Sequence, residues 1–160
     1  IQDGLRKAAQ THGQLASIGV DTWGVDFGLL DECDELLGNP VHYRDARNNG
    51  MMEQVFQAVP REEVFASTGL QFMQFNTLFQ LAALKKQNSP QLRIAKSLLF
   101  MPDLLHFWLT GEKRNEYSIA STSQMLDAKT RRWDVELLNR LGLPHEILGE
   151  IVMPGTQIGT

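Results

Sequence analysis

The feature that most constrains the fold is a change of hydrophobic period along the chain. Apolar residues alternate with polar or small ones over positions 16–20 and again over 25–29, which is the period of a half-buried strand. Further along, the apolar residues recur at helical spacing instead. Early strands followed by helices predict a mixed α/β chain, strand-rich over 14–47 and mostly helical over 48–150.

Local start and stop signals divide this pattern into elements. An acidic turn at residues 31–35 separates two pairs of leucines and predicts an antiparallel hairpin. Pro102 and Gly111 begin and end one predicted helix. Asp134, a good N-cap residue, and Gly142, a good stop, bound another.

Charge and composition argue against several classes of protein. Fifteen Lys and Arg against nineteen Asp and Glu give a net charge of −4, whereas a nucleic-acid-binding surface needs a cationic face. The most apolar stretch, residues 98–109, is interrupted by Pro102, Asp103 and His106, so it is not expected to span a membrane. The single cysteine, Cys33, has no intrachain partner for a disulfide, which fits a cytoplasmic protein.

The sequence contains no recognisable metal or nucleotide motif. The four histidines, at positions 12, 42, 106 and 145, are far apart and have no partner at metal-ligand spacing, so no metal site is expected. Neither GxxxxGK(S/T) nor GxGxxG occurs, and no phosphate-binding loop is therefore predicted.

The most informative stretch is the polar corner between the two predicted strands, residues 21–26. Trp23 offers an apolar face to the C–H side of a sugar or another polyol, and Gly24 permits close approach to the backbone. The Asp26 carboxylate can accept hydrogen bonds from hydroxyl groups. The same residues also fit a tight turn with a core tryptophan and capping carboxylates, and both interpretations stay open at this point.

Two further polar groups have the same ambiguity. Residues 44–47, with the sequence RDAR, form either an Arg–Asp lattice under the hairpin or a polar wall of the same pocket. Over residues 71–79, three phenylalanines interleave with amide side chains, Asn76 among them. Such a mixture suits a carbohydrate pocket as well as it suits the start of a helix.

In these segments the sequence resembles the FGGY family of carbohydrate kinases, and within it most closely the rhamnulokinases. Residues 18–27, IGVDTWGVDF, are similar to the family's sugar-site strand, and residues 40–47, PVHYRDAR, are similar to its next block. Additional similar segments follow in the family's order and spacing at residues 68–72, 75–78, 101–104, 109–111 and 116–118. The resemblance therefore covers nearly all 160 residues.

The resemblance implies a ribonuclease-H-like (actin-like ATPase) α/β domain fragment with a mixed sheet, an antiparallel hairpin and helical insertions. Residues 1–160 would be part of the N-terminal, sugar-binding lobe of a two-lobed kinase that phosphorylates a ketose. L-rhamnulose is the first choice of substrate, with fuculose or xylulose as alternatives. The alternative hypothesis is a non-catalytic sugar-binding or assembly module of the same superfold.

The resemblance also implies which residues bind the substrate. Gly24 matches a family position that contacts the sugar, Thr22 and Trp23 lie beside it, and Phe75 falls near a sugar-contacting aromatic. With the two polar residues singled out above, the predicted substrate-binding set is Thr22, Trp23, Gly24, Asp26, Phe75 and Asn76.

Cofactors and partners follow from the same resemblance. The family's first phosphate-binding segment is expected upstream of Ile1, and its catalytic aspartate and adenosine-binding motifs beyond Thr160. ATP and Mg²⁺ are thus expected for the full-length enzyme, and no catalytic residue is assigned to this chain, which we expect to be inactive alone. The expected partners are a small sugar and a second kinase lobe, without nucleic acid or membrane, and the oligomeric state stays open.

Overall fold

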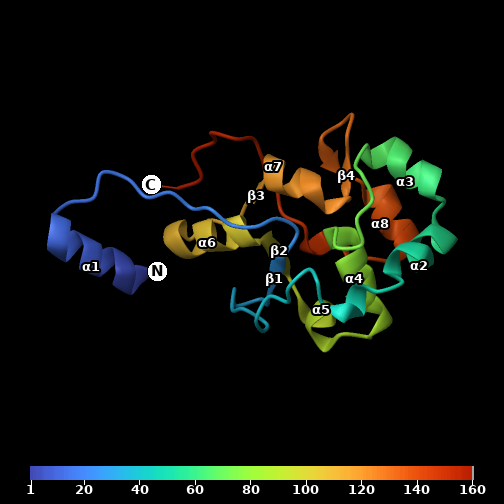
Figure 1. Ribbon diagram of the computed structural model, residues 1–160, viewed down its shortest axis with the longest axis horizontal. Coiled ribbons are helices and arrows are strands. Elements are labelled where there is room, and N and C mark those ends of the chain that lie inside the picture. Colours follow the sequence, from blue (N-terminus) through green and yellow to red (C-terminus); the bar gives the residue numbers. More distant parts are fainter. Residues whose placement is uncertain (160) are drawn as a thin grey trace.

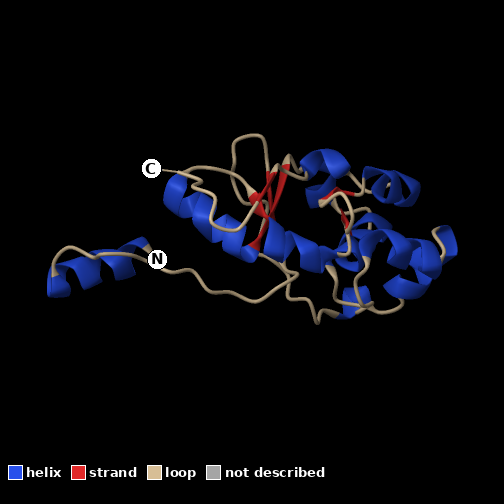
Figure 2. Ribbon diagram, turned by 90° about the horizontal axis from the view of Figure 1, so that it is seen from above, coloured by secondary structure: helices blue, strands red, loops and turns tan. Residues whose placement is uncertain are grey.

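The computed structural model describes residues 1–159, in which most helices pack beside three short pairs of strands (Figures 1 and 2). The α-helices are α1 (Gln2–His12), α2 (Met51–Ala58), α3 (Arg61–Thr68), α4 (Thr77–Lys86), α5 (Pro90–Ile94), α6 (Met101–Thr110), α7 (Tyr117–Ala120) and α8 (Val135–Leu141). Short 3-10 turns are η1 (Ala46–Asn48), η2 (Ser121–Ser123) and η3 (His145–Ile147).

Both parallel and antiparallel strand pairs occur. β1 (Phe27–Leu30) pairs antiparallel with β2 (Ser97–Phe100), with Phe27 opposite Phe100. β3 (Asn115–Glu116) runs parallel to β6 (Ile151–Val152), and β4 (Leu126–Asp127) is antiparallel to β5 (Arg132–Trp133). The predicted mixed α/β class is confirmed, although the strands form separate short pairs in the described residues.

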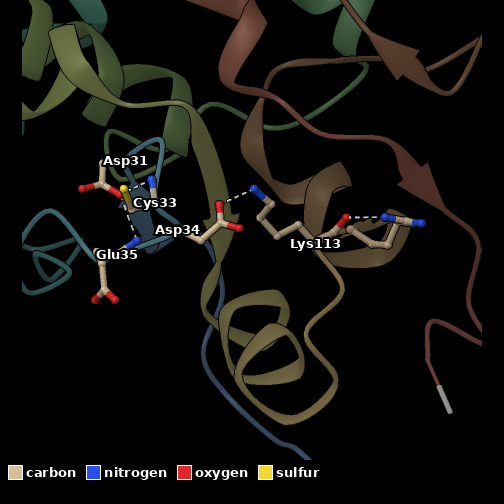
Figure 3. Close-up of polar contacts among 6 residues, drawn as sticks. Asp31, Cys33, Asp34, Glu35 and Lys113 are labelled. Carbon is tan, nitrogen blue, oxygen red and sulfur yellow. Dashed lines mark hydrogen bonds and ion pairs between the residues drawn. The ribbon is translucent and has the colours of Figure 1, made fainter.

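The hairpin predicted around the acidic turn is confirmed. Leu30, the last residue of β1, forms an antiparallel bridge with Leu36. Within the turn, the Asp31 carboxylate accepts two backbone N–H hydrogen bonds, at 2.8 and 3.0 Å. Figure 3 shows these bonds and the ion pair that joins Asp34 to Lys113, which tethers the turn to the segment after α6.

The strand predicted over residues 16–20 is wrong. Ile18 is 52% exposed, and the described residues provide no neighbouring strand with which this segment forms backbone hydrogen bonds. Alternation alone does not make a strand, because its N–H and C=O groups need a paired partner. The segment instead connects α1 to β1. In both overall views α1 lies apart from the other helices, and none of its residues is buried (Figures 1 and 2).

The ends of the later helices agree with their predicted signals. Gly111 follows α6 with φ 78°, a left-handed conformation that glycine adopts without a steric penalty. The Asp134 side chain accepts a hydrogen bond from the Leu137 N–H at 2.9 Å and so caps α8, which Gly142 ends.

The helix α4 lies inside the hydrophobic core. Leu78, Phe79 and Leu81 are fully buried, and α4 contacts α2, η1 and η2. A helix that buries apolar side chains around its circumference is typical of a core element. Its polar residue Gln80 is also fully buried, and the start of the helix lies against the corner discussed below. The described residues contain no helix that is long and apolar enough to span a bilayer.

Candidate functional site

The candidate site is built on a strained backbone corner just before β1. Val25 has φ 67°, a left-handed conformation that is rare and costly for a β-branched residue. The Val25 carbonyl accepts hydrogen bonds from Thr77 Oγ1 at 2.7 Å and from Gln80 Nε2 at 3.1 Å. Both donors belong to the start of α4, so a core helix holds the corner in its unusual conformation.

Trp23 and Asp26 are joined across this corner. The indole Nε1 of Trp23 donates a hydrogen bond to Asp26 Oδ2 at 2.5 Å. The tryptophan is 51% exposed, whereas the aspartate is only 1% exposed. The apolar ring of Trp23 is therefore accessible to solvent, while its N–H is bound by the buried Asp26 carboxylate. Such a ring is suited to pack against the C–H face of a polyol.

Two opposing influences act on the charge of Asp26. Burial raises the pKa of its carboxyl above the usual value, while the hydrogen bond from Trp23 and the nearby His42 lower that pKa. Arg47 is half-buried: burial lowers the pKa of its guanidinium, and the negative Asp45 and Asp26 raise that pKa. The corner thus contains a buried carboxyl whose negative charge favours the charged form of the partly buried Arg47 guanidinium.

Four buried polar atoms have no hydrogen-bond partner among the described residues: Asp26 Oδ1, Arg47 Nε, Asn48 Oδ1 and Gln80 Oε1. Gln80 faces the corner, and Asn48 Nδ2 donates to the Tyr43 carbonyl at 2.8 Å. Neither Asn48 nor Gln80 was predicted. The available signal for Gln80 was a single amide within an apolar helical run, and Arg47 lay in the RDAR segment whose role was left open.

The other predicted aromatic, Phe75, lies close to the corner. Its carbonyl accepts a hydrogen bond from Gln80 Nε2 at 2.9 Å, the same amide group that binds the Val25 carbonyl. Its half-buried ring packs edge-on against Tyr43, with 5.3 Å between the ring centroids. The start of α4 thereby brings together two predicted groups that lie about fifty residues apart in the sequence.

Asn76 is turned toward a different partner. It is 3% exposed, and its Nδ2 donates to Gln124 Oε1 at 2.7 Å and to the Gln71 carbonyl at 3.1 Å. These contacts fasten the start of α4 to the loop before it and to the residue after η2. A structural role accounts for both hydrogen bonds of its amide nitrogen.

Gly24 and Thr22 lie on the more open part of the corner. A Cβ atom added to Gly24 would be 3.7 Å from Ile119 Cδ1 and 3.8 Å from Thr122 Oγ1, which are ordinary contact distances. The partly exposed Thr22 donates its hydroxyl to the Trp23 carbonyl at 3.1 Å. The corner is therefore bordered by the start of α4 on one side and by α7 and η2 on another.

One cavity lies away from the predicted substrate-binding residues. A cavity of about 630 Å³ beside α3 is lined by Arg61, Glu62, Phe65, Gly69, Gln71 and Phe72, and none of these belongs to the predicted substrate-binding set. Over residues 1–159, no group of three or more His, Cys, Asp and Glu residues could hold a metal ion.

The whole chain matches a known protein family. The model of the N-terminal domain of the FGGY family of carbohydrate kinases matches residues 1–160. The chain therefore belongs to this family.

Among curated relatives, the chain is 47% identical over 160 residues to the rhamnulokinase of Bacteroides thetaiotaomicron, covering 100% of this chain and 33% of the relative. It is 45% identical over 159 residues to the rhamnulokinase of Halalkalibacterium halodurans, covering 99% of this chain and 34% of the relative. The chain thus spans about a third of the length of the curated relatives that it matches.

Solved structures agree on the fold. The ligand-bound xylulose kinase of Lactobacillus acidophilus superposes with a TM-score of 0.86 at 23% identity, covering 99% of this chain and 33% of that one. The gluconate kinase of the same organism gives a TM-score of 0.84 at 22% identity, covering 97% and 32%. The ribonuclease-H-like (actin-like ATPase) class predicted from the sequence is confirmed.

Proposed function

We propose that this chain is the sugar-binding portion of an ATP-dependent carbohydrate kinase that phosphorylates a ketose, with L-rhamnulose as first choice. The observation that carries the proposal is the identity of 42–47% to rhamnulokinases over nearly the whole chain. The exposed, hydrogen-bonded indole of Trp23 supports sugar binding at the corner.

In this proposal the sugar lies against Trp23 and Gly24, with Thr22 and Phe75 at the edges of its site. Asp26 and Asn76 support this surface from positions that are almost fully buried. A sugar has an apolar C–H face and a rim of hydroxyl groups, so an aromatic ring beside backbone and hydroxyl hydrogen-bonding groups is a suitable surface for it.

ATP and Mg²⁺ belong to the proposed reaction but are not assigned to residues of this chain. The described part of the chain has no acidic or histidine cluster that fits a metal ion, and the sequence has no phosphate-binding loop motif. Because the chain spans about a third of the length of the rhamnulokinases that it matches, we assign the nucleotide, the metal ion and the aspartate that accepts the hydroxyl proton to the rest of a longer, cytoplasmic protein. A second kinase lobe would be the partner that encloses the sugar.

A substrate panel tests the proposed sugar. The full-length protein is assayed for ADP release with L-rhamnulose, L-fuculose and D-xylulose, and the highest kcat/KM is expected for L-rhamnulose. A preference for another ketose would change the sugar but keep the kinase. No turnover with any ketose would favour the non-catalytic binding or assembly module.

The variant Trp23→Ala tests the site. Removing the ring is expected to raise the KM for the sugar roughly tenfold, about 1.4 kcal/mol of binding free energy, with little change in the KM for ATP. The matched control is Trp108→Ala, because Trp108 is similarly exposed, at 47%, but lies on α6. A change in the KM for ATP alone would contradict the proposed site.

A further inference from the structure

Asp26 is enclosed in a way that prevents direct contact with a ligand. Its side chain is 1% exposed, and among the described residues Oδ1 has neither solvent contact nor a hydrogen-bond partner of good geometry, although the Gln80 side chain and the Tyr43 backbone lie near enough to lower the pKa of the carboxyl. Oδ2 is occupied by the indole N–H of Trp23 at 2.5 Å. A substrate at this corner would therefore contact Trp23 and not the Asp26 carboxylate itself.

The backbone around this carboxylate is fixed on both sides. The Asp26 N–H donates to the Gly24 carbonyl at 2.9 Å, and its carbonyl accepts from the Met101 N–H at 3.1 Å. The preceding carbonyl, that of Val25, is held by two side chains of α4. With the backbone held in this way, the acceptor Oδ2 has a set position, and the indole must align with it to keep its hydrogen bond.

Packing alone does not account for a carboxylate at this position. A buried carboxylate with an unpaired oxygen loses its hydration, and an apolar side chain of similar volume would avoid that cost. Leucine is the closest apolar match in shape to aspartate. Leucine would supply neither the negative charge near the half-buried Arg47 nor an acceptor for the Trp23 N–H. An unpaired indole N–H is free to leave this orientation.

We infer that Asp26 is a positioning residue, which fixes the angle of the Trp23 ring against the sugar and so sets sugar affinity without touching the sugar. The inference rests on the proposed function. It assigns to Trp23 the contact with the ligand and to Asp26 the orientation of that contact. A fixed ring loses less conformational freedom when the ligand binds, so its orientation contributes to affinity.

The test compares Asp26→Leu with Asp26→Asn in the full-length protein. Asp26→Leu removes the acceptor and is expected to raise the sugar KM roughly tenfold, while kcat and the KM for ATP stay within about twofold. Asp26→Asn retains an amide oxygen of the same reach and is expected to restore the sugar KM to within about twofold of the parent. An Asp26→Asn protein as impaired as Asp26→Leu would overturn the inference.

Trp23→Phe separates positioning from a general loss of structure. Phenylalanine keeps an apolar ring but has no N–H, so Asp26→Leu is expected to have no further effect on the sugar KM in the Trp23→Phe background. An equal effect in both backgrounds would overturn the inference. If Asp26→Leu does not fold, Trp23→Phe alone carries the test: a raised sugar KM supports the inference and an unchanged one overturns it.

Failure of this inference is distinguishable from failure of the proposed site. If Trp23→Ala leaves the sugar KM unchanged, the proposed sugar site is wrong. If Trp23→Ala raises the sugar KM but Asp26→Leu does not, the site stands and only the positioning role of Asp26 is lost.

Discussion

At the scale of single residues, the most unusual electrostatic environment belongs to Asp103, in the first turn of α6. The side chain is 3% exposed, Oδ1 accepts from the Glu116 N–H at 3.2 Å, and Oδ2 accepts from Asn115 Nδ2 at 3.4 Å. Burial raises the pKa of the carboxyl to about 7, and these hydrogen bonds only partly oppose the shift. The residue thus connects α6 to β3 through a carboxyl that titrates near neutral pH.

The raised pKa of Asp103 predicts a loss of stability on the alkaline side. Because the folded carboxyl binds its proton more tightly than the unfolded one, its contribution is fully present below pH 4 and is lost as the pH rises to about 7. Each pKa unit corresponds to about 1.4 kcal/mol, so the upper bound is about 4 kcal/mol. Melting temperatures of the full-length protein between pH 5 and 8 should fall more steeply than those of Asp103→Asn.

The control for this measurement is Asp21→Asn, which replaces an exposed carboxylate. Its melting temperatures should follow the parent profile. Parallel profiles for the parent and Asp103→Asn would contradict a neutral-range titration of this buried group.

At the scale of elements, the approach of α6 to β1 depends on a missing side chain. A Cβ atom at Gly28 would lie 2.8 Å from Leu36 Cδ1 and 2.9 Å from Leu104 Cδ2. Glycine in the interior of a strand often marks such a close approach. The hairpin partner Leu36 and the helix α6 therefore pack onto the same face of β1 only because this position is empty of side-chain atoms.

The variant Gly28→Val should force these elements apart. Overpacking of a filled core is expected to lower the free energy of unfolding by about 1–3 kcal/mol, measured by urea denaturation of the full-length protein. The matched control is Gly19→Val, because no atom lies within 4 Å of a Cβ placed there. Equal stability of the two variants would show that β1 and α6 can separate without cost.

At the scale of the whole molecule, the chain supplies about a third of the length of its curated relatives. No residue of the described chain is assigned to ATP or to proton abstraction. The isolated 160-residue chain is therefore expected to release no ADP in a sugar-dependent manner, with the full-length protein as the positive control in the same coupled assay. Sustained sugar-dependent turnover by the isolated chain would contradict this division of roles.

Which parts of the fold were predictable depends on the range of the interactions that determine them. The ends of α6 and α8 were predicted because Gly111, Asp134 and Gly142 act on their own helix termini. The strand over 16–20 was not, because pairing is decided by distant residues. Likewise, the left-handed Val25 depends on contacts from α4 that no local pattern contains.

In the candidate site, too, local features were predictable from the sequence and long-range contacts were not. The sequence singled out Trp23 because an aromatic ring beside glycine is visible locally. The burial of Asp26 and Gln80, in contrast, follows from how α4 packs against the corner. The sequence thus singled out Trp23 and Asp26 as candidate ligand-binding residues, but it indicated neither the burial of Asp26 nor the participation of Gln80.

The placement of α4 links two properties that are usually treated separately. Its middle turns fill the interior of the protein, and its first turn grips the carbonyl next to the tryptophan. A loosening of the hydrophobic core, by heat or by truncation of Leu81, would thus be transmitted through α4 to the Trp23 ring. Ligand recognition and thermal endurance would then decline together, and selection for one would constrain the other.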